Sequence, residues 1–171
     1  MKAGGINLLK IRNVLIDDLP ELVTIENLCF SKEEAATRES FAKRIQRIPD
    51  SFFVAEENGV IMGLVNGPVL ETAYITDKLF TEINANPASG GHQSILGLAV
   101  SPLYRKLGVA ARLLSHLEEA ARMKQRETIT LTCKQELILF YEKQGYLNTG
   151  ISPSKHGGAT WYNMIKSLIN D

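Results

Sequence analysis

The residues whose types and spacing best suggest chemistry lie where an apolar segment, residues 94–101, meets a basic turn. Pro102 ends the segment, and Arg105-Lys106-Leu107-Gly108 leads into a helical pattern. The first N–H groups of a helix have no partner within the helix, and the helix dipole favours anions there. A glycine lets a phosphate approach the backbone, and the two cations add positive charge. The turn therefore predicts a diphosphate site, although it contains neither GxxxxGK[ST] nor GxGxxG.

An ordinary strand-to-helix turn with solvated Arg and Lys is the alternative for this short motif. Its position favours the phosphate site, because the turn follows an apolar strand and opens an amphipathic helix. The helix has Ala110, Leu114, Leu117 and Ala121 on one face.

Tyr141 is the second candidate for chemistry, in the sequence Phe140-Tyr141-Glu142-Lys143-Gln144-Gly145-Tyr146. A phenol with a pKa of about 10 can give a proton to a leaving thiolate, whose thiol has a pKa of about 8.5. The apolar residues 137–140 precede it, so a core tyrosine with a satisfied hydroxyl is the alternative.

Hydrophobic periodicity predicts the elements that must position these residues. We expect helices over residues 17–29, begun by Asp17 or Asp18, and over 33–47, 107–124 and 135–144, while 72–80 is ambiguous between a short helix and a loop. We expect strands over residues 8–14, 51–57, 60–69, 94–101, 128–133, 146–150 and 159–165. The sum is a mixed α/β domain with an antiparallel start and a central β-α-β crossover.

Composition limits the remaining possibilities. The chain has 171 residues, 44% of them hydrophobic, and its 19 basic and 19 acidic residues give no net charge. This favours one globular domain over residues 1–171 and argues against binding nucleic acid by bulk charge. Cys29 and Cys133 have no metal-ligand spacing, and no apolar run reaches the roughly 18 residues of a membrane span. We therefore expect a soluble cytoplasmic protein that uses no metal and binds neither nucleic acid nor membrane.

Together the two motifs resemble the GCN5-related N-acetyltransferase (GNAT) family. The family pattern Arg/Gln-x-x-Gly-x-Gly/Ala, after a hydrophobic-x-Val-x-Pro strand end, is matched by residues 98–102 and 105–110. The family's Phe-Tyr-x-x-x-Gly-Phe/Tyr element is matched by residues 140–146. The resemblance extends over residues 11–165. It is closest to the arylalkylamine (serotonin) N-acetyltransferases, on the segments Ile25-Glu26-x-x-Cys29-Phe30-Ser31, Phe53-Val54-Ala55-Glu56 and Leu131-Thr132-Cys133 before Phe140-Tyr141.

The resemblance implies a fold and a donor site. The fold would be a mixed, mostly antiparallel sheet of about six or seven strands with about four flanking helices and a central β-α-β unit that binds acetyl-CoA. The pyrophosphate would be bound by the turn, and the pantetheine arm and thioester carbonyl by the strand before it. The turn positions are Arg105, Lys106, Leu107, Gly108, Val109, Ala110 and Ala111, and the strand positions are Leu98, Ala99 and Val100. Tyr141 matches the family tyrosine that protonates the departing thiolate.

At the positions of the general base, this sequence differs from the arylalkylamine pattern. Those enzymes carry two histidines on this strand, where the present chain has Ser94 and Leu96. His92 lies two residues before Ser94, on the same side of a strand, and would act through a water chain. A loop histidine is the alternative, and Glu26 and Glu71 are further candidates as remote bases or cation-binding groups.

We therefore expect an acetyl-CoA-dependent N-acetyltransferase in which a primary amine attacks the donor directly in a ternary complex. A non-catalytic acyl-CoA-binding module and an acetyltransferase for a protein N-terminus or lysine are the alternatives. Residues 31–37 and 84–91 are expected to line the acceptor site, whose ligand the sequence does not identify. Late strands of this fold often pair between subunits, so the resemblance allows a homodimer.

Overall fold

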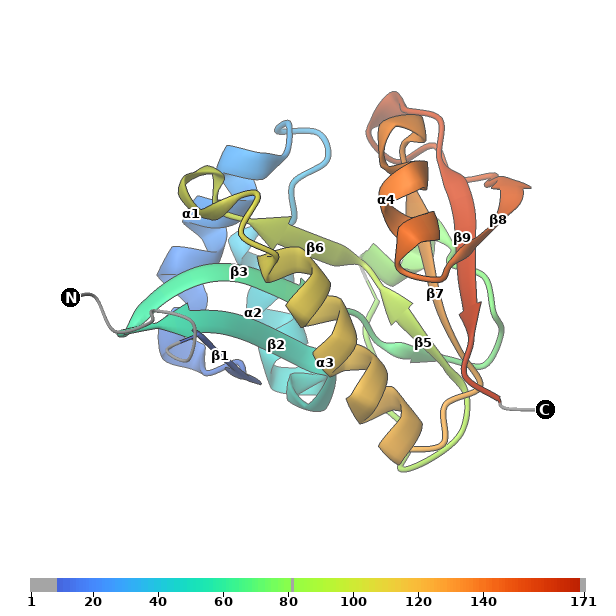
Figure 1. Ribbon diagram of the computed structural model, residues 1–171, viewed down its shortest axis with the longest axis horizontal. Helices are drawn as coiled ribbons and strands as arrows, with labels where there is room; N and C mark the ends of the chain where they lie inside the picture. Colours follow the sequence, from blue (N-terminus) through green and yellow to red (C-terminus); the bar gives the residue numbers. More distant parts are fainter. Residues whose placement is uncertain (1–8, 81, 170–171) are drawn as a thin grey trace.

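A computed structural model describes residues 9–80 and 82–169 (Figure 1). The first residue of the strand expected at 8–14 lies outside this part. The helices are α1 (Leu19–Cys29), α2 (Arg38–Arg47), α3 (Val109–Met123) and α4 (Ile138–Lys143). The strands are β1 (Leu9–Asn13), β2 (Phe52–Glu57), β3 (Val60–Asn66), β4 (Val69–Leu70), β5 (His92–Ile95), β6 (Gly97–Val100), β7 (Thr128–Cys133), β8 (Leu147–Ile151) and β9 (Tyr162–Ser167).

The described strands form two sheets rather than one. The first has four strands in the order β1-β2-β3-β6, and the second has five in the order β4-β5-β7-β9-β8. Only the β5–β7 pair is parallel among the described strands, which confirms the mixed, mostly antiparallel fold with a central crossover. The crossover helix α3 packs against the first sheet and lies in front of it in Figure 1.

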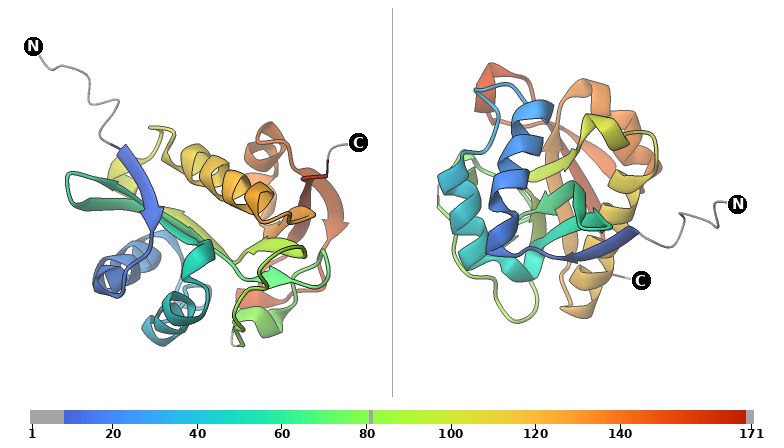
Figure 2. Two further views of the ribbon diagram at one scale, coloured as in Figure 1. Left: turned by 90° about the horizontal axis from the view of Figure 1, so that it is seen from below. Right: turned by 90° about the vertical axis from the view of Figure 1, so that its left-hand side faces the viewer.

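The first sheet has a core on each of its faces, and β2 contributes to both. Phe52 and Val54 point toward α1 and α2, while Phe53 and Ala55 point toward α3. This division follows from the two-residue repeat of a strand. All four side chains are at most 3% exposed, as expected for a strand covered on both faces. Figure 2 shows α1 and α2 on one side of the sheet and α3 on the other.

All four helices begin two to five residues later than predicted, and the starts of α2 and α1 show why. α2 begins at Arg38 and not at residue 33, because the Thr37 side chain accepts the Ser40 N–H and caps the helix there. Asp18 precedes α1 as expected, but its carboxylate binds no amide of that helix. It instead accepts the Leu15 N–H and pairs with the Arg12 guanidinium, which joins the start of α1 to β1.

Two strands were predicted longer than they are, and the segment that the sequence left ambiguous contains a single helical turn. The strand expected at 60–69 is interrupted after Asn66, and only Val69–Leu70 continues as β4 in the other sheet. Residues 77–80 form the one helical turn found within 72–80. The last strand begins at Tyr162 and not at residue 159, because His156–Gly158 form a tight turn before it.

In the described residues, no helix is long and apolar enough to cross a membrane.

Candidate active site

The candidate site lies where the strand predicted over residues 94–101 divides into two strands, β5 and β6. Its first part, β5, pairs in parallel with β7, and its second part, β6, pairs with β3 of the other sheet. The division falls at Leu96, whose N–H donates to the Asn66 carbonyl at 2.8 Å, out of register with the β3–β6 ladder. Because β6 follows one sheet and β7 the other, the two strands diverge (Figure 1). Residues at the start of β6 and at the end of β7 line a cleft between them.

The edge of β6 that faces the cleft has no partner strand in the described structure. On the opposite edge, the Ser101 N–H donates to the Met62 carbonyl at 2.8 Å. In an antiparallel ladder, alternate residues bond to the partner strand and those between them face away. The N–H groups of Leu98 and Val100 therefore face the cleft, whereas that of Ala99 faces β3. Of the three predicted strand positions, two offer amides to a ligand.

The basic turn leads from β6 into α3 with two residues in the left-handed region, Lys106 at φ 65° and Gly108 at φ 79°. Gly108 is the residue before α3, and nothing lies within 4 Å of the place that a Cβ would occupy there. The first helical hydrogen bond joins the Arg112 N–H to the Gly108 carbonyl at 3.1 Å. The amides of residues 109–111 therefore have no partner within the helix and are available to an anion.

The side chains of this turn divide between solvent and core. Those of Arg105, Lys106 and Leu107 are exposed, whereas Val109 is 2% exposed and packs in the core beneath α3. Arg105 folds back toward β6, where its Nη2 lies 3.5 Å from the Cys29 Sγ. Val109 can therefore take part in ligand binding only through its amide.

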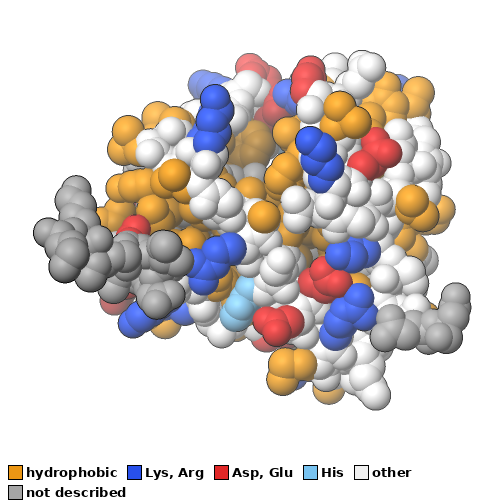
Figure 3. Space-filling model, in the orientation of Figure 1, with side chains coloured by type: hydrophobic (Ala, Val, Ile, Leu, Met, Phe, Trp, Pro, Cys, Tyr) orange, Lys and Arg blue, Asp and Glu red, His pale blue; other side chains and the backbone are white. Residues whose placement is uncertain are grey.

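A cavity of about 680 Å³, including its open mouth, lies between the diverging strands. Figure 3 shows this face hollowed between α1 and α4, with Lys and Arg side chains on both sides of the hollow. Residues 95–98 line the cavity on one side and residues 131–133 on the other, and Phe30, Leu137 and Trp161 add apolar walls. The cavity is thus a largely apolar compartment beside the open edge of β6.

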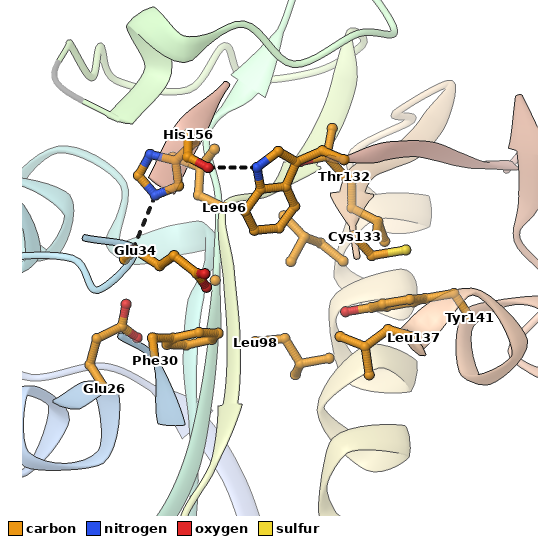
Figure 4. A pocket seen from close by; sticks show the side chains of 14 residues that line it. Glu26, Phe30, Glu34, Leu96, Leu98, Thr132, Cys133, Leu137, Tyr141 and His156 are labelled. Carbon is orange, nitrogen blue, oxygen red and sulfur yellow. Dashed lines mark hydrogen bonds between the residues drawn. The ribbon is translucent and has the colours of Figure 1, made fainter. Parts of the chain in front are cut away.

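Tyr141 from α4 reaches this cavity, and its hydroxyl points into it in Figure 4. Its ring packs edge-on against Phe140 and Tyr146, at centroid distances of 5.1 and 5.6 Å. The side chain is 6% exposed, and burial raises the pKa of its hydroxyl well above the usual range. The hydroxyl therefore keeps its proton at neutral pH and can donate a hydrogen bond to a group in the cavity.

The sequence profile of the acetyltransferase (GNAT) family matches residues 19–146 of this chain, a span that includes the basic turn and Tyr141. The chain belongs to this family. The match does not extend to the arylalkylamine subgroup, which the resemblance had suggested. A comparison with curated protein sequences gave no match.

Solved structures of GNAT-like proteins have the same fold at low sequence identity. The GphF GNAT-like decarboxylase in complex with isobutyryl-CoA superposes with a TM-score of 0.78 at 19% identity, over 94% of this chain and 100% of that one. Arabidopsis thaliana Naa50, in complex with the bisubstrate analogue CoA-Ac-MVNAL, has a TM-score of 0.73 at 17% identity, over 94% and 99%. Salmonella typhimurium yncA, with its cofactor acetyl-CoA, has a TM-score of 0.68 at 16% identity, over 96% of each chain.

His92, one of the candidate bases that the sequence offers, does not line the cavity. It lies opposite Thr128 at the start of β7, whereas Cys133 lines the cavity at the other end, about 17 Å along the strand. The two ring nitrogens contact the Thr128 hydroxyl at 2.9 Å and the Glu127 carboxylate at 3.0 Å. Glu71 lines a different depression of the surface. The structure therefore brings neither of these residues to Tyr141.

Two carboxylates do reach the cavity of this GNAT protein. Glu26 comes from α1 and Glu34 from the segment between α1 and α2, and both face the side opposite Tyr141 in Figure 4. Glu34 pairs with Lys134 at 2.5 Å, and its backbone carbonyl lies 3.1 Å from the His156 Nε2. Within the described residues, no cluster of three or more His, Cys, Asp or Glu side chains could hold a metal ion.

The sequence predicted Glu26 only as one of several alternatives, and Glu34 only as part of the segment 31–37 that was expected to line the acceptor site. A signal for Glu26 exists, because it shares the helix face of Leu22 and Ile25, where a charged residue is unexpected. Glu34 and His156 are far apart in the sequence and meet through long-range packing, which no local pattern reveals.

Proposed function

We propose that this GNAT protein is an N-acetyltransferase that moves an acetyl group from acetyl-CoA to a primary amine, by direct attack in a ternary complex. One observation carries the proposal. The Tyr141 hydroxyl lies in the cavity that the open edge of β6 borders, and the same strand leads to the exposed amides at the start of α3. A diphosphate site, an extended groove and a proton donor therefore follow one another in space.

The residues of the turn fit the diphosphate of acetyl-CoA. The open space at Gly108 allows a phosphate oxygen to approach the amides of residues 106–111, and Arg105 and Lys106 supply positive charge. The amides of Leu98 and Val100 suit the pantetheine arm, which would add to β6 as a further strand. An amide of β6 that donates to the thioester carbonyl would stabilise the negative charge that develops on its oxygen during attack.

We assign Tyr141 the role of hydrogen-bond and proton donor to the departing sulfur. A raised pKa makes the hydroxyl a weak acid, so it does not ionise before the reaction. As the C–S bond breaks, negative charge develops on the sulfur, and the Tyr141 hydroxyl, which points into the largely apolar cavity, can give its proton to it. General acid catalysis of this kind contributes about 10²- to 10⁴-fold to a rate.

Isothermal titration calorimetry with acetyl-CoA and dephospho-CoA tests the donor site, and release of free thiol in the presence of an amine panel tests transfer. We expect acetyl-CoA to bind and at least one amine to give thiol release. Absence of heat with both nucleotides would exclude the donor site. Tight binding with no thiol release from any amine would instead indicate a non-catalytic acyl-CoA-binding module.

A further inference from the structure

Glu26 has a buried carboxylate of which only one oxygen is bonded. The side chain is 4% exposed, and its Oε2 accepts the Ala36 N–H at 2.7 Å. Its Oε1 is buried and has no hydrogen-bond partner among the described residues. Native proteins rarely leave a buried carboxylate oxygen unpaired, because the lost solvation is costly. The bonded oxygen explains how Glu26 holds the segment between α1 and α2, but it gives the second oxygen no role.

Glu26 stands at the junction of two hollows. It lines the cavity that contains Tyr141 and also an adjoining hollow of about 720 Å³, whose walls include Thr37, Ser40 and Arg44. Glu34, Leu96 and His156 line both spaces as well, so the two are neighbours. Tyr141 lines only the first of them. The Glu26 side chain is therefore within reach of a ligand in either space.

Burial and the neighbouring charged groups act in opposite directions on the pKa of the Glu26 carboxyl. Burial raises the pKa of its carboxyl, while the Ala36 N–H and the positive charge of Arg44 oppose that rise. Arg44 is 2% exposed, and burial lowers its pKa to about 10, which still leaves it protonated at neutral pH. The two side chains make no direct ion pair, and the Arg44 Nη1 donates to Asn66 at 3.0 Å instead. The other titratable side chains on the two hollows are Glu34, Asp77, Cys133, Tyr141 and His156.

We propose that the Glu26 Oε1 binds the amino group of the acceptor and takes its proton, which makes Glu26 the general base and the residue that selects protonated amines. This inference rests on the proposed acetyltransferase function. An ammonium group supplies the donor that the buried oxygen lacks, and its positive charge favours the ionised carboxylate. The raised pKa brings the carboxylate closer to the basicity that proton abstraction requires than a surface glutamate would be.

The proton balance of the reaction closes with these two residues. The acceptor ammonium gives one proton to Glu26, and the nitrogen lone pair then forms the C–N bond at the thioester carbonyl carbon. The C–S bond breaks with its electron pair on sulfur, which takes the proton of Tyr141. The second proton of the nitrogen returns to Tyr141, and Glu26 releases its proton to solvent. The products are the N-acetyl amine and free coenzyme A.

The test compares the wild-type protein with Glu26→Gln. The glutamine oxygen can still accept the Ala36 N–H, so the segment stays tethered, while its NH₂ group now meets the amine with a donor instead of an acceptor. With the best amine of a panel, we expect kcat/KM to fall at least about 100-fold. The dissociation constant of acetyl-CoA and the melting temperature should stay close to the wild-type values. The acid limb of the pH profile of kcat/KM should disappear in the variant.

Two matched variants separate Glu26 from its surroundings. Glu34→Gln removes the other carboxylate on both hollows and should lower kcat/KM far less and keep the acid limb. Glu21→Gln changes an exposed glutamate of the same helix and should leave all values unchanged. Small amines, a peptide with a free N-terminus and a lysine peptide form the arms of the panel, because each presents the same ammonium group.

Each outcome decides one of the two claims. If the wild type acetylates an amine and Glu26→Gln stays within about 3-fold of it, or keeps the acid limb, the role of Glu26 is wrong and the acetyltransferase function stands. If Glu34→Gln causes the larger loss, Glu34 is the base instead. If the wild type binds acetyl-CoA but releases no thiol with any arm, the proposed function fails, and the role of Glu26 fails with it.

Discussion

The candidate donor and acceptor sides of the cleft are built in different ways. The candidate donor side is one continuous stretch, residues 97–111, in which a strand, a turn and a helix start follow one another. The candidate acceptor side combines α1, the segment after it, the end of β7 and the turn before β9, which are distant in the sequence. The donor side depends mainly on the backbone, whereas the acceptor side depends on side chains. The two sides should therefore respond separately to mutation, and the following experiments test that separation.

The largest effect is expected at the point where both sides meet. Tyr141→Phe removes the proposed proton donor and should lower kcat about 10²- to 10⁴-fold, with little change in acetyl-CoA affinity. Tyr146→Phe is the matched control, because its ring packs against Tyr141 but does not line the cavity. Steady-state kinetics and calorimetry measure the two quantities. Equal losses in both variants would show that the aromatic packing matters and the Tyr141 hydroxyl does not.

The next effect should fall on the donor side alone. Gly108→Ala puts a methyl group where a phosphate is expected, so the dissociation constant of acetyl-CoA should rise about 10- to 100-fold. Gly59 in the β2–β3 hairpin has nearly the same geometry, with φ +80° and an equally open Cβ position. Alanine at either position costs about 1 kcal/mol of backbone strain. If Gly59→Ala weakens acetyl-CoA binding as much, the loss comes from stability and not from the phosphate site.

A smaller effect is expected on the acceptor side. Lys134→Met removes the ion pair with Glu34, which connects the end of β7 to the segment after α1. Lys134 is partly exposed, and such pairs are worth about 0.2–1 kcal/mol, so KM for the amine should rise about 1.5- to 5-fold. Binding of acetyl-CoA should stay unchanged. A change in donor affinity without a change in amine KM would contradict the separation of the two sides.

The smallest effect on the site is expected from Asp18→Asn, which lies in neither region. Burial opposes ionisation of Asp18, but the hydrogen bonds from Arg12 and from the Leu15 amide outweigh it and lower its pKa. A carboxyl whose pKa is lowered by folding adds stability above its unfolded pKa of about 3.9, and that stability is lost as the pH falls through the folded pKa. The variant should lose about 1–2 kcal/mol of unfolding free energy at pH 7 and almost none at the acid end.

Denaturant unfolding across the pH range measures this difference. Acetyl-CoA affinity and amine KM should be unchanged in Asp18→Asn at pH 7. A pH-independent loss of stability would show that the side chain matters for packing and not for its charge.

The sequence predicted best those structural features that depend on residues close to one another in the chain. Strand β7 was predicted with its exact limits, and the turn at Gly108 was predicted because proline, cations, glycine and a helix start lie within a few residues. The division at Leu96 was missed, because it depends on the carbonyl of Asn66, which belongs to another strand. An apolar pattern on both faces indicates a covered strand but does not reveal that the strand changes sheets.

The acceptor side was less predictable for the same reason. His92 is two residues before Ser94 and therefore lies on the same side of the strand. It pairs with Thr128, however, at the end of β7 that is distant from the cavity. Which end of a strand faces the cleft depends on the point of divergence, which the residues of the strand do not specify. Glu26 could be found as a charge on an apolar helix face, but its unpaired oxygen depends on how the chain returns at Ala36.

The open edge of β6 has a consequence for how this protein can change over time. The amides of Leu98 and Val100 are main-chain groups, and every residue except proline provides one. Substitutions on this strand can therefore accumulate without altering the hydrogen bonds that it offers, provided that the backbone keeps its course. Chains that differ from this one at about four-fifths of their positions retain the same architecture. Divergence is consequently expected to concentrate in the side chains that choose the acceptor.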